Sequence, residues 1–345
     1  MKKNSGYDEL KKSIKNGGFA PFYIFYGEES YLREYSLAEI RKKTVAKDME
    51  SFNYTVLEAN AVTLGSLTDA ISSYPVFSEK KLVVLRDFDI LKPPAAMQDG
   101  LLSLIKDLPD YICLIASYDT ISFPDAKLSA AGEEIKKKAV PVNFQKQGEA
   151  ELTNWVIRRF AALGKNISGK DAEYLIFVSG AYMNTLINEI EKLAAYETKE
   201  AITQKDIDTV AVKALDAQIY YLTDCITSGK ADKAILIIRD LLMLRYEPVV
   251  LMGAVTRQML RLYSAKLLTK EGRHMDELMK LWGMKSSYPA EKLLMGADGY
   301  SKEALEKSLE LCAKADLQLK STVLPKAEVL ELLILNIAAL MRTVK

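Results

Sequence analysis

Short apolar runs alternate with helical patterns along the first 145 residues of the chain. Five of these runs are mostly apolar, at residues 22–26, 52–57, 82–85, 111–115 and 139–144. Apolar runs without polar alternation are typical of strands buried on both faces of a sheet. The stretches between them are long enough for crossover helices, at residues 29–43, 63–73, 95–107 and 127–138. The pattern predicts an α/β domain with a parallel sheet of doubly wound type.

Strand signals stop near residue 148, and helical periodicity continues toward the end of the chain. Helices are predicted at residues 152–163, 170–178, 183–197 and 203–212. The last of these carries a capping signature from Thr203 to Asp206. Beyond residue 213 the helices lengthen. Apolar residues of the final helix follow the i, i+3, i+4, i+7 spacing of a buried helical face, at Leu330, Leu333, Ile334 and Ile337.

Three domains are therefore expected: an α/β domain over 1–145, a small helical domain over 146–212 and an all-α bundle over 213–345. A chain of 345 residues is too long for one ordinary core, since domains usually hold roughly 100–200 residues. Wide apolar faces in the third domain are typical of a packed core. Any such face left over after packing would favour oligomerisation.

The charge of the chain is nearly balanced. Lysine and arginine number 47 against 46 aspartate and glutamate residues. The chain therefore lacks the long-range positive field that brings a stand-alone nucleic-acid binder onto phosphates. Any contact with DNA must be local or shared. Apolar residues make up 49% and charged residues 27%, which is the composition of a folded globular protein.

Residue types that build metal and disulfide sites are sparse. The three cysteines, Cys113, Cys225 and Cys312, lie far apart in apolar stretches, which suggests neither a disulfide framework nor a CxxC metal site and fits a reducing cytoplasm. The single histidine, His274, has no cysteine nearby, which argues against a zinc site or a catalytic triad. The most apolar segment, 329–341, is shorter than the ~20 residues that span a bilayer. We expect a cytoplasmic protein with no cofactor and no membrane contact.

Gly27 follows the first predicted strand, where a P-loop protein places its phosphate cradle and its lysine. Here the glycine is followed by Glu28 and Glu29, and no lysine is present at that point. Two carboxylates at a helix N-terminus stabilise the helix dipole and repel a triphosphate. Asp87 and Asp89 follow a strand as a Walker B acid does, but loop-forming carboxylates explain them at least as well. The sequence predicts no nucleotide site here.

A second motif has the spacing GxxxxGK, from Gly164 to Lys170. A true P-loop requires a strand before the loop and a helix after it. This segment follows a predicted helix. We therefore interpret Gly164 as a helix C-cap, and Ser168 with Asp171 as the capping box of the next helix.

Segments in all three predicted domains match one known pattern in their order and spacing. Residues 22–32 hold a strand followed by a Gly-Glu-Glu sequence, and residues 75–85 combine an apolar pair, a serine, basic residues and a strand. The other matching segments are 152–156, 186–193 and 201–206, followed by 247–248, 257–261 and 315–320. Together these segments resemble the delta subunit of the bacterial DNA polymerase III clamp loader, over nearly the whole chain.

The resemblance implies an AAA+-like first domain with a degenerate P-loop, a helical lid domain and a helical collar domain that joins subunits into a pentameric ring. Other members of that ring hydrolyse ATP, whereas this subunit binds and opens the sliding clamp. The implied partners are the β clamp, the gamma/tau and delta-prime subunits, and primer-template DNA within the assembled loader. No catalytic residue, cofactor or metal is implied for this chain.

The clamp-binding site that the resemblance implies is the pair Val76 and Phe77, flanked by Pro75 and Ser78. The family often has Leu-Phe, so the apolar plug here is one methylene smaller. Proline cannot continue the preceding helix, which predicts a turn. Taken alone, an aromatic residue at a strand entry favours burial in the core. A polar flank favours instead an exposed anchor within a polar rim, and that flank contains Ser72, Ser73, Ser78, Glu79, Lys80 and Lys81.

Two other functions fit parts of the sequence. An AAA+ ATPase with an unusual nucleotide site is supported by the GxxxxGK spacing alone. A loader subunit of the delta-prime kind, acting as a stator, would usually carry a cysteine-rich zinc module and a Ser-Arg-Cys motif, and the sequence has neither.

Overall fold

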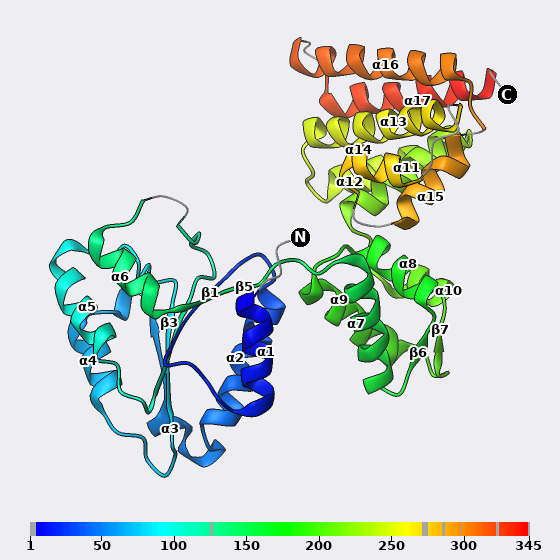
Figure 1. The fold of residues 1–345 in the computed structure, drawn as a ribbon. Helices are drawn as coiled ribbons and strands as arrows, with labels where there is room; N and C mark the ends of the chain where they lie inside the picture. Colours follow the sequence, from blue (N-terminus) through cyan, green and yellow to red (C-terminus); the bar gives the residue numbers. More distant parts are fainter. Residues whose placement is uncertain are drawn as a thin grey trace. The chain divides into compact units, whose positions relative to one another are not determined.

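The computed structural model describes residues 5–124, 127–270, 275–284, 287–297, 299–321 and 324–343. The chain divides into two compact units, Met1–Gln147 and Gly148–Lys345 (Figure 1). Each unit is described on its own below. The division into three domains stays a prediction, and His274 lies outside the described residues.

The first unit is built on a five-stranded sheet in the order β2-β3-β4-β1-β5, and every neighbouring pair in it is parallel. The strands are β1 (Phe22–Tyr26), β2 (Tyr54–Glu58), β3 (Lys81–Arg86), β4 (Ile112–Ser117) and β5 (Val140–Asn143). β4 and nearly all of β1 and β3 are buried, as continuous apolar runs require. The predicted parallel sheet is confirmed.

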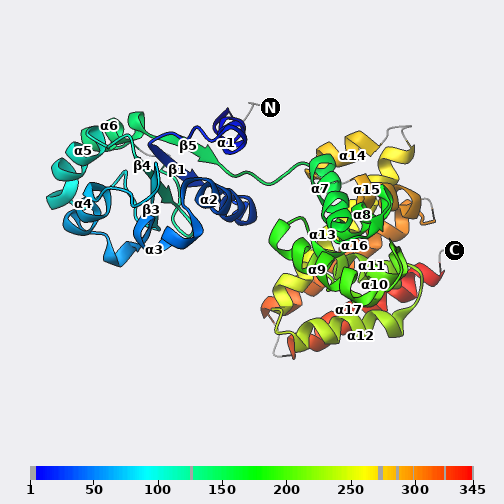
Figure 2. The same ribbon diagram turned by 90° about the horizontal axis from the view of Figure 1, so that it is seen from below.

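Helices cover both faces of this sheet. They are α1 (Ser5–Asn16), α2 (Ser30–Thr44), α3 (Glu50–Asn53), α4 (Leu64–Ser72), α5 (Gln98–Lys106) and α6 (Ala130–Lys138). Figures 1 and 2 both show α1 and α2 on the side opposite α4, α5 and α6. Alternate strand residues point to opposite faces, so Ile24 and Val83 pack with Leu67, Leu101 and Ile135 from that second helical layer.

One predicted strand begins two residues later than expected. Phe52 and Asn53 were assigned to the strand from the apolar pattern, but they form the end of α3. The Phe52 side chain is 57% exposed, whereas Asn53 is fully buried. The apolar pattern therefore predicts the wrong secondary structure for both residues at this boundary.

The second unit begins with α7 (Glu149–Ala162), α8 (Gly169–Ser179), α9 (Met183–Tyr196) and α10 (Gln204–Val210). Between them, β6 (Asn166–Ile167) and β7 (Ala201–Ile202) form a parallel pair. Strands of two residues give no periodic signal in the sequence. The predicted capping box is confirmed, since the Thr203 amide donates to Asp206 Oδ2 over 2.8 Å.

The other helices described in this unit are α11 (Leu215–Thr227), α12 (Ala231–Met243), α13 (Pro248–Lys270), α14 (Met275–Trp282), α15 (Ser287–Ala297), α16 (Lys302–Ser321) and α17 (Lys326–Thr343). The predicted lengthening beyond residue 213 holds for α13, α16 and α17 but not for α14, which has 8 residues. The predicted apolar face of α17 is buried in their common core at Leu330, Leu333, Ile334 and Ile337. None of the helices in the described ranges has an apolar stretch long enough to cross a bilayer.

An aromatic cluster joins α8 to α11 and α15. The Phe177 ring centroid lies 5.3 Å from that of Tyr220 on α11 and 5.2 Å from that of Tyr288 on α15. Tyr174 of the same helix hydrogen-bonds through its hydroxyl to Tyr221. These contacts explain why the residues expected for a lid and a collar lie within one compact unit.

The three cysteines are free, as their spacing predicted. Cys113 and Cys312 are buried, and Cys225 is partly buried. Burial raises the pKa of Cys113 to about 12, so this thiol is neutral and unreactive at physiological pH.

Candidate functional site

The segment between α4 and β3 presents Phe77 to solvent. Its side chain is 89% exposed, whereas Pro75, Val76 and Ser78 are partly buried. The sequence taken alone favoured burial of this phenylalanine in the core, and the structure places it at the surface. Leaving such a side chain in water forgoes roughly 1.5–3 kcal/mol of burial free energy. Isolated cases are common on protein surfaces, so the backbone of Phe77 is the more informative feature.

Phe77 adopts a left-handed backbone conformation, with φ at 50°. This region is disfavoured for residues with a Cβ atom, by roughly 1–2 kcal/mol, and it is unusual for a bulky aromatic residue. Such strain persists where the surrounding structure fixes the chain, and it is concentrated at functional sites. The backbone at Phe77, and with it the direction in which the side chain leaves the chain, is therefore fixed by neighbouring residues.

The strongest of these restraints comes from Asn53 at the end of α3. Its Nδ2 donates to the carbonyl oxygen of Val76 over 2.7 Å, and its Oδ1 accepts from the Val76 amide, also over 2.7 Å. Asn53 is fully buried. Both backbone groups of the residue that precedes Phe77 are thus fixed to the body of the domain.

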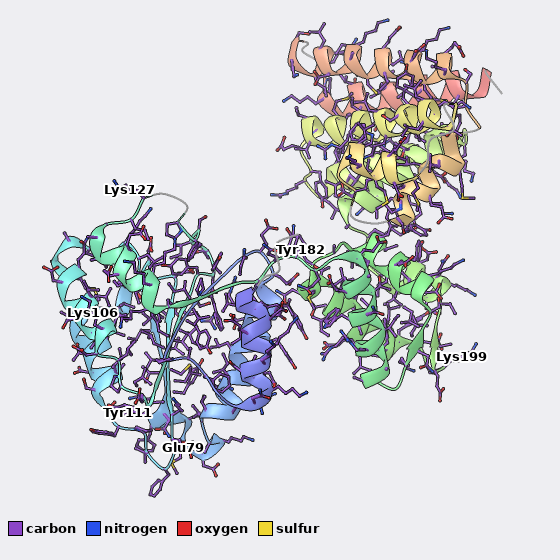
Figure 3. The ribbon with its side chains drawn as sticks, viewed as in Figure 1. Glu79, Lys106, Tyr111, Lys127, Tyr182 and Lys199 are labelled. Atoms are coloured by element: carbon purple, nitrogen blue, oxygen red, sulfur yellow. The ribbon has the colours of Figure 1, made fainter. Side chains whose placement is uncertain are left out.

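The start of β3 and the loop before β4 hold the other end of the segment. The Lys81 amide donates to the carbonyl oxygen of Tyr111 over 2.8 Å, and Lys80 Nζ donates to the carbonyl oxygen of Asp110 over 2.5 Å. Tyr74 places its ring 4.9 Å from that of Tyr111. Figure 3 shows Glu79 and Tyr111 at the same end of the first unit. We refer to residues 73–80 as the Phe77 loop.

Not all of the polar residues predicted to surround Val76 and Phe77 form an exposed rim around them. Lys81 is 5% exposed, and its Nζ donates to Ser73 Oγ. It therefore supports the Phe77 loop from beneath and is not a rim residue. Its burial lowers the pKa of the Lys81 ammonium, because a low-dielectric environment disfavours the charged form.

The carboxyl edge of the same sheet is where a P-loop protein would bind nucleotide. Gly27 has φ at 119°, and a Cβ there would lie 2.5 Å from the carbonyl oxygen of Phe144. The close approach of the chain after β5 is enough to require glycine. Glu28 pairs with Lys146 over 3.1 Å, and Glu29 is the buried N-cap of α2. Close packing therefore explains the glycine at position 27, and this residue does not indicate a phosphate site.

Charged side chains occupy the rest of this edge. Arg33 is buried; its Nε lies 2.8 Å from Asp119 Oδ1, and its Nη1 donates to the carbonyl oxygen of Gly27 over 2.9 Å. Arg86 also binds Asp119, over 2.8 Å. Its guanidinium makes two further hydrogen bonds, of 2.5 and 2.9 Å, to the carboxylate of Glu34. In these ion pairs, the charged groups that could otherwise contact phosphate or magnesium bind one another.

Asp87 and Asp89 form loops, as their position after a strand indicated. The carboxylate of Asp87 accepts hydrogen bonds of 2.7 Å from the amides of Asp119 and Thr120. Burial acts to raise the pKa of Asp87, but the hydrogen bonds from Thr120, Asp119 and Ile121 outweigh it and hold that pKa below its ordinary value. Asp89 accepts from the Tyr118 hydroxyl over 2.8 Å. Within the described ranges, no three acidic, histidine or cysteine side chains gather as metal ligands would.

The GxxxxGK segment is a helix end followed by a helix start. Gly164 has φ at 71°, and the Lys165 amide donates to the Phe160 carbonyl oxygen over 2.9 Å, as in a Schellman C-cap. Ser168 Oγ accepts from the Asp171 amide over 3.1 Å and donates to its carboxylate over 2.7 Å. The Gly164 C-cap is confirmed, and Ser168 is the N-cap of α8. The predicted capping box is only half formed, because the Asp171 carboxylate accepts from the Ser168 hydroxyl and not from its amide.

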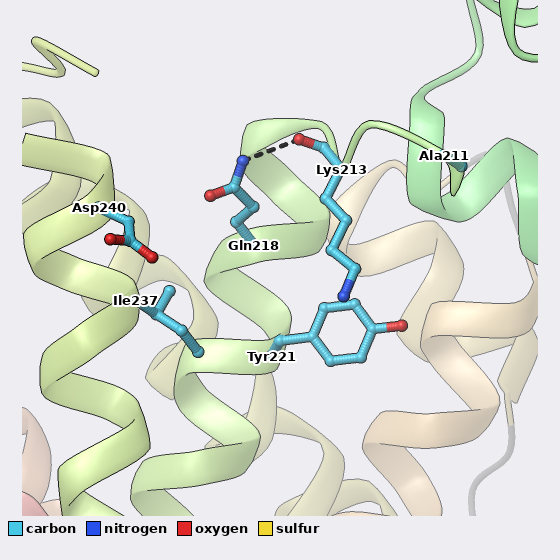
Figure 4. A pocket seen from close by; sticks show the side chains of 6 residues that line it. All are labelled: Ala211, Lys213, Gln218, Tyr221, Ile237 and Asp240. Atoms are coloured by element: carbon cyan, nitrogen blue, oxygen red, sulfur yellow. Dashed lines mark hydrogen bonds between the residues drawn. The ribbon is translucent and has the colours of Figure 1, made fainter. Parts of the chain in front are cut away.

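A pocket in the second unit lies beside the connection from α10 to α11 (Figure 4). It is lined by Ala211, Lys213, Gln218, Tyr221, Ile237 and Asp240. Lys213 Nζ lies 4.5 Å from the centre of the Tyr221 ring, and Gln218 Nε2 donates to the Lys213 carbonyl oxygen over 2.8 Å. These contacts fix the connection against α11.

Sequence reasoning missed Asn53. It lies 23 residues before Val76, and a single asparagine between two aromatic residues gives no periodic or motif signal. The pairing of β2 with β3 aligns Tyr54 with Leu82 and so brings the end of α3 beside the Phe77 loop. That neighbourhood follows from topology and has no counterpart in local sequence.

Comparisons with known proteins agree across the chain. The family model "DNA polymerase III, delta subunit" matches residues 23–145, and "DNA polymerase III delta subunit, C-terminal domain" matches residues 216–337. The DNA polymerase III subunit delta of Bacillus subtilis is 25% identical over 339 residues, covering 95% of this chain and 96% of the relative. The Escherichia coli subunit is 23% identical over 319 residues, covering 91% and 90%.

A solved structure is similar in fold. The Bacillus subtilis DNA clamp loader delta protein aligns over 97% of this chain and 99% of its own, with a TM-score of 0.52 and 22% sequence identity. This similarity supports the architecture described above, from the parallel sheet to the helical second unit.

Proposed function

Because the chain belongs to the DNA polymerase III delta subunit family, we propose that its Phe77 loop binds the sliding clamp and that this binding opens the clamp ring. As a delta subunit it is a non-catalytic part of the clamp loader and acts in DNA replication. The proposal concerns how it does so. It assigns clamp binding to Val76 and Phe77, with Pro75 and Ser78 shaping the turn.

The observation that carries the proposal is the exposed Phe77 on a strained and braced loop. A hot spot of an interface is typically an aromatic side chain that enters a pocket of the partner, surrounded by polar residues that exclude water. Phe77 has the required exposure, and its fixed backbone reduces the conformational entropy lost on binding. Ser72, Ser73 and Glu79 are exposed around it and supply the polar rim.

Opening of the clamp would follow from differential affinity. A ligand shifts an equilibrium between closed and open rings only if it binds the open ring more tightly. We propose that the Phe77 loop fits a clamp surface whose shape is relaxed when the adjoining ring interface is open. The coupling free energy would be about 1–3 kcal/mol, the range usual between linked sites.

Hydrolysis of ATP is assigned to other subunits. The ion pairs of Arg33, Asp119 and Arg86 at the carboxyl edge of the sheet support this division, because those groups are bound to one another. We propose gamma/tau and delta-prime subunits as ring partners, joined through a collar domain over 213–345. A lid domain over 146–212 would precede the collar in the chain. Primer-template DNA would be contacted within the assembled loader, in the cytoplasm.

Calorimetric titration of the purified full-length chain with the sliding clamp of the same organism tests this function. We expect a saturable complex without ATP or other subunits. Titration with ATP and magnesium in place of the clamp is expected to give no binding heat. Absence of a complex with the clamp, or micromolar binding of ATP, would overturn the proposal.

A further inference from the structure

We infer that Asn53 is the positioning residue of the clamp-binding loop, holding Phe77 in its exposed direction through two hydrogen bonds to the backbone of Val76. The inference rests on the proposed function of the Phe77 loop. It concerns a residue that lies outside the loop and is fully buried, so Asn53 acts on the clamp only through Phe77.

The geometry of the contact is that of a short strand pairing made by a side chain. One carboxamide serves both the amide and the carbonyl of Val76, with 2.7 Å for each bond. A residue held at both backbone groups has little freedom in φ and ψ. Its successor, Phe77, is the residue with the left-handed backbone. The contact that fixes Val76 therefore also stabilises the strained conformation next to it.

Asn53 is itself fixed by the sheet. It is the last residue of α3, and the next residue, Tyr54, pairs with Leu82 in the β2–β3 ladder. Leu82 lies just beyond the end of the Phe77 loop. The carboxamide thus connects the loop to a rigid element, as precise presentation of a binding residue requires.

The side chain at position 53 needs both a donor and an acceptor. Alanine would leave the amide and carbonyl of Val76 without their present partners. Aspartate would keep the acceptor for the Val76 amide but turn an oxygen toward the Val76 carbonyl, which repels it. Asparagine meets both needs at this reach, because its carboxamide offers one group of each kind.

Loss of these bonds should reduce the fraction of molecules in which Phe77 points correctly. Apparent affinity falls in proportion to the binding-competent fraction. If that fraction drops to roughly 1–10%, Asn53→Ala weakens clamp binding by about 10- to 100-fold. The change arises without any lost contact between position 53 and the clamp.

A double-mutant cycle on the full-length chain tests this. Clamp affinity is measured by calorimetry for wild type, Asn53→Ala, Phe77→Ala and the double variant. We expect Asn53→Ala to weaken binding in the wild-type background and to add little in the Phe77→Ala background, since its effect passes through Phe77. Hydrogen exchange at the Val76 amide should accelerate in Asn53→Ala, while exchange within β4 is unchanged.

Asp87→Ala is the matched control, because Asp87 also fixes a loop by accepting backbone hydrogen bonds, at the opposite edge of the sheet. It should destabilise the domain and leave clamp affinity unchanged. If Asn53→Ala fails to fold, Asn53→Asp takes its place in the cycle. An unchanged affinity of the position-53 variant, or an equal loss in both backgrounds, would overturn the inference. If Phe77→Ala itself keeps wild-type affinity, the proposed function fails instead.

Discussion

The carboxamide of Asn53 and the backbone of Val76 are joined by two hydrogen bonds of 2.7 Å, one in each direction, across 23 residues of sequence. A buried polar group therefore determines the shape of an exposed loop. Each polar atom of the Asn53 side chain makes one of these two bonds, so neither atom is buried without a partner. The exposure of Phe77 is therefore linked to the folded domain through the hydrogen bonds of Asn53.

Replacing Phe77 by glycine should not destabilise the protein. Glycine relieves roughly 1–2 kcal/mol of left-handed backbone strain and adds roughly 0.5–1 kcal/mol of unfolded-state entropy. The free energy of unfolding, measured by denaturant titration, should therefore equal or slightly exceed that of wild type. Phe52→Gly is the control, since Phe52 is exposed but helical and should lose stability. A clear loss in Phe77→Gly would mean that Phe77 packs against the domain.

The pH dependence of stability should reveal Lys81. Its pKa is lowered by burial, so between that value and the ordinary ~10.4 the unfolded chain binds more protons than the folded one. Stability of the wild type therefore rises with pH across this alkaline window. Lys81→Met should be at least as stable at neutral pH. Its free energy of unfolding should lack the part of the alkaline rise that comes from Lys81. Parallel curves of unfolding free energy against pH for the two proteins would refute the assignment.

Removing the Asp87 carboxylate should cost stability without affecting ATP hydrolysis by the loader. The lost hydrogen bonds to the amides of Asp119 and Thr120 are worth about 1–3 kcal/mol in total. The pKa of Asp87 is held below its ordinary value, so its stabilisation is present above ~3.9 and is lost as pH falls through the folded-state value. Asp87→Ala and wild type should converge in strong acid. Loss of ATPase activity in a loader reconstituted with Asp87→Ala would instead indicate a magnesium ligand.

A fragment comprising residues 1–147 should fold and bind the clamp. This unit has its own core and contains the whole Phe77 loop. It lacks the residues proposed as the collar, so it should not join the other loader subunits. Gel filtration with clamp and with loader subunits separates the two expectations. Normal assembly of the loader around the fragment would contradict the collar proposal.

The central strands β1, β3 and β4 could be predicted because they are buried on both faces and are therefore mostly apolar. The outer strands β2 and β5 are only partly buried, and the start of β2 was the boundary that the apolar pattern missed. The helix caps at Ser168 and Thr203 were equally predictable, since capping depends on residues three apart. Lys81 was expected in a polar rim, yet it is buried. Its environment depends on Ser73 across a turn, which the pattern of apolar positions does not encode.

The candidate site was harder to predict than the fold. Local pattern favoured burial of Phe77, and the family resemblance favoured its exposure; only the structure supplies the left-handed backbone and the contact with Asn53. The contact with Asn53 depends on the register of β2 against β3. Long-range register of this kind is set by the whole sheet and cannot be derived from a window of sequence.

The affinity of a Val76→Ala, Phe77→Ala double variant for the sliding clamp tests the account most directly. Truncating both side chains should cost about 3–5 kcal/mol of binding free energy, on the order of a hundred- to several-thousand-fold in Kd. The melting temperature should stay close to that of wild type, because Phe77 is exposed and Val76 is only partly buried in the free protein. Tyr196→Ala, an exposed aromatic residue of the second unit, should bind normally. A double variant that binds the clamp as tightly as wild type, or that unfolds, would contradict the assignment of Val76 and Phe77 to clamp binding.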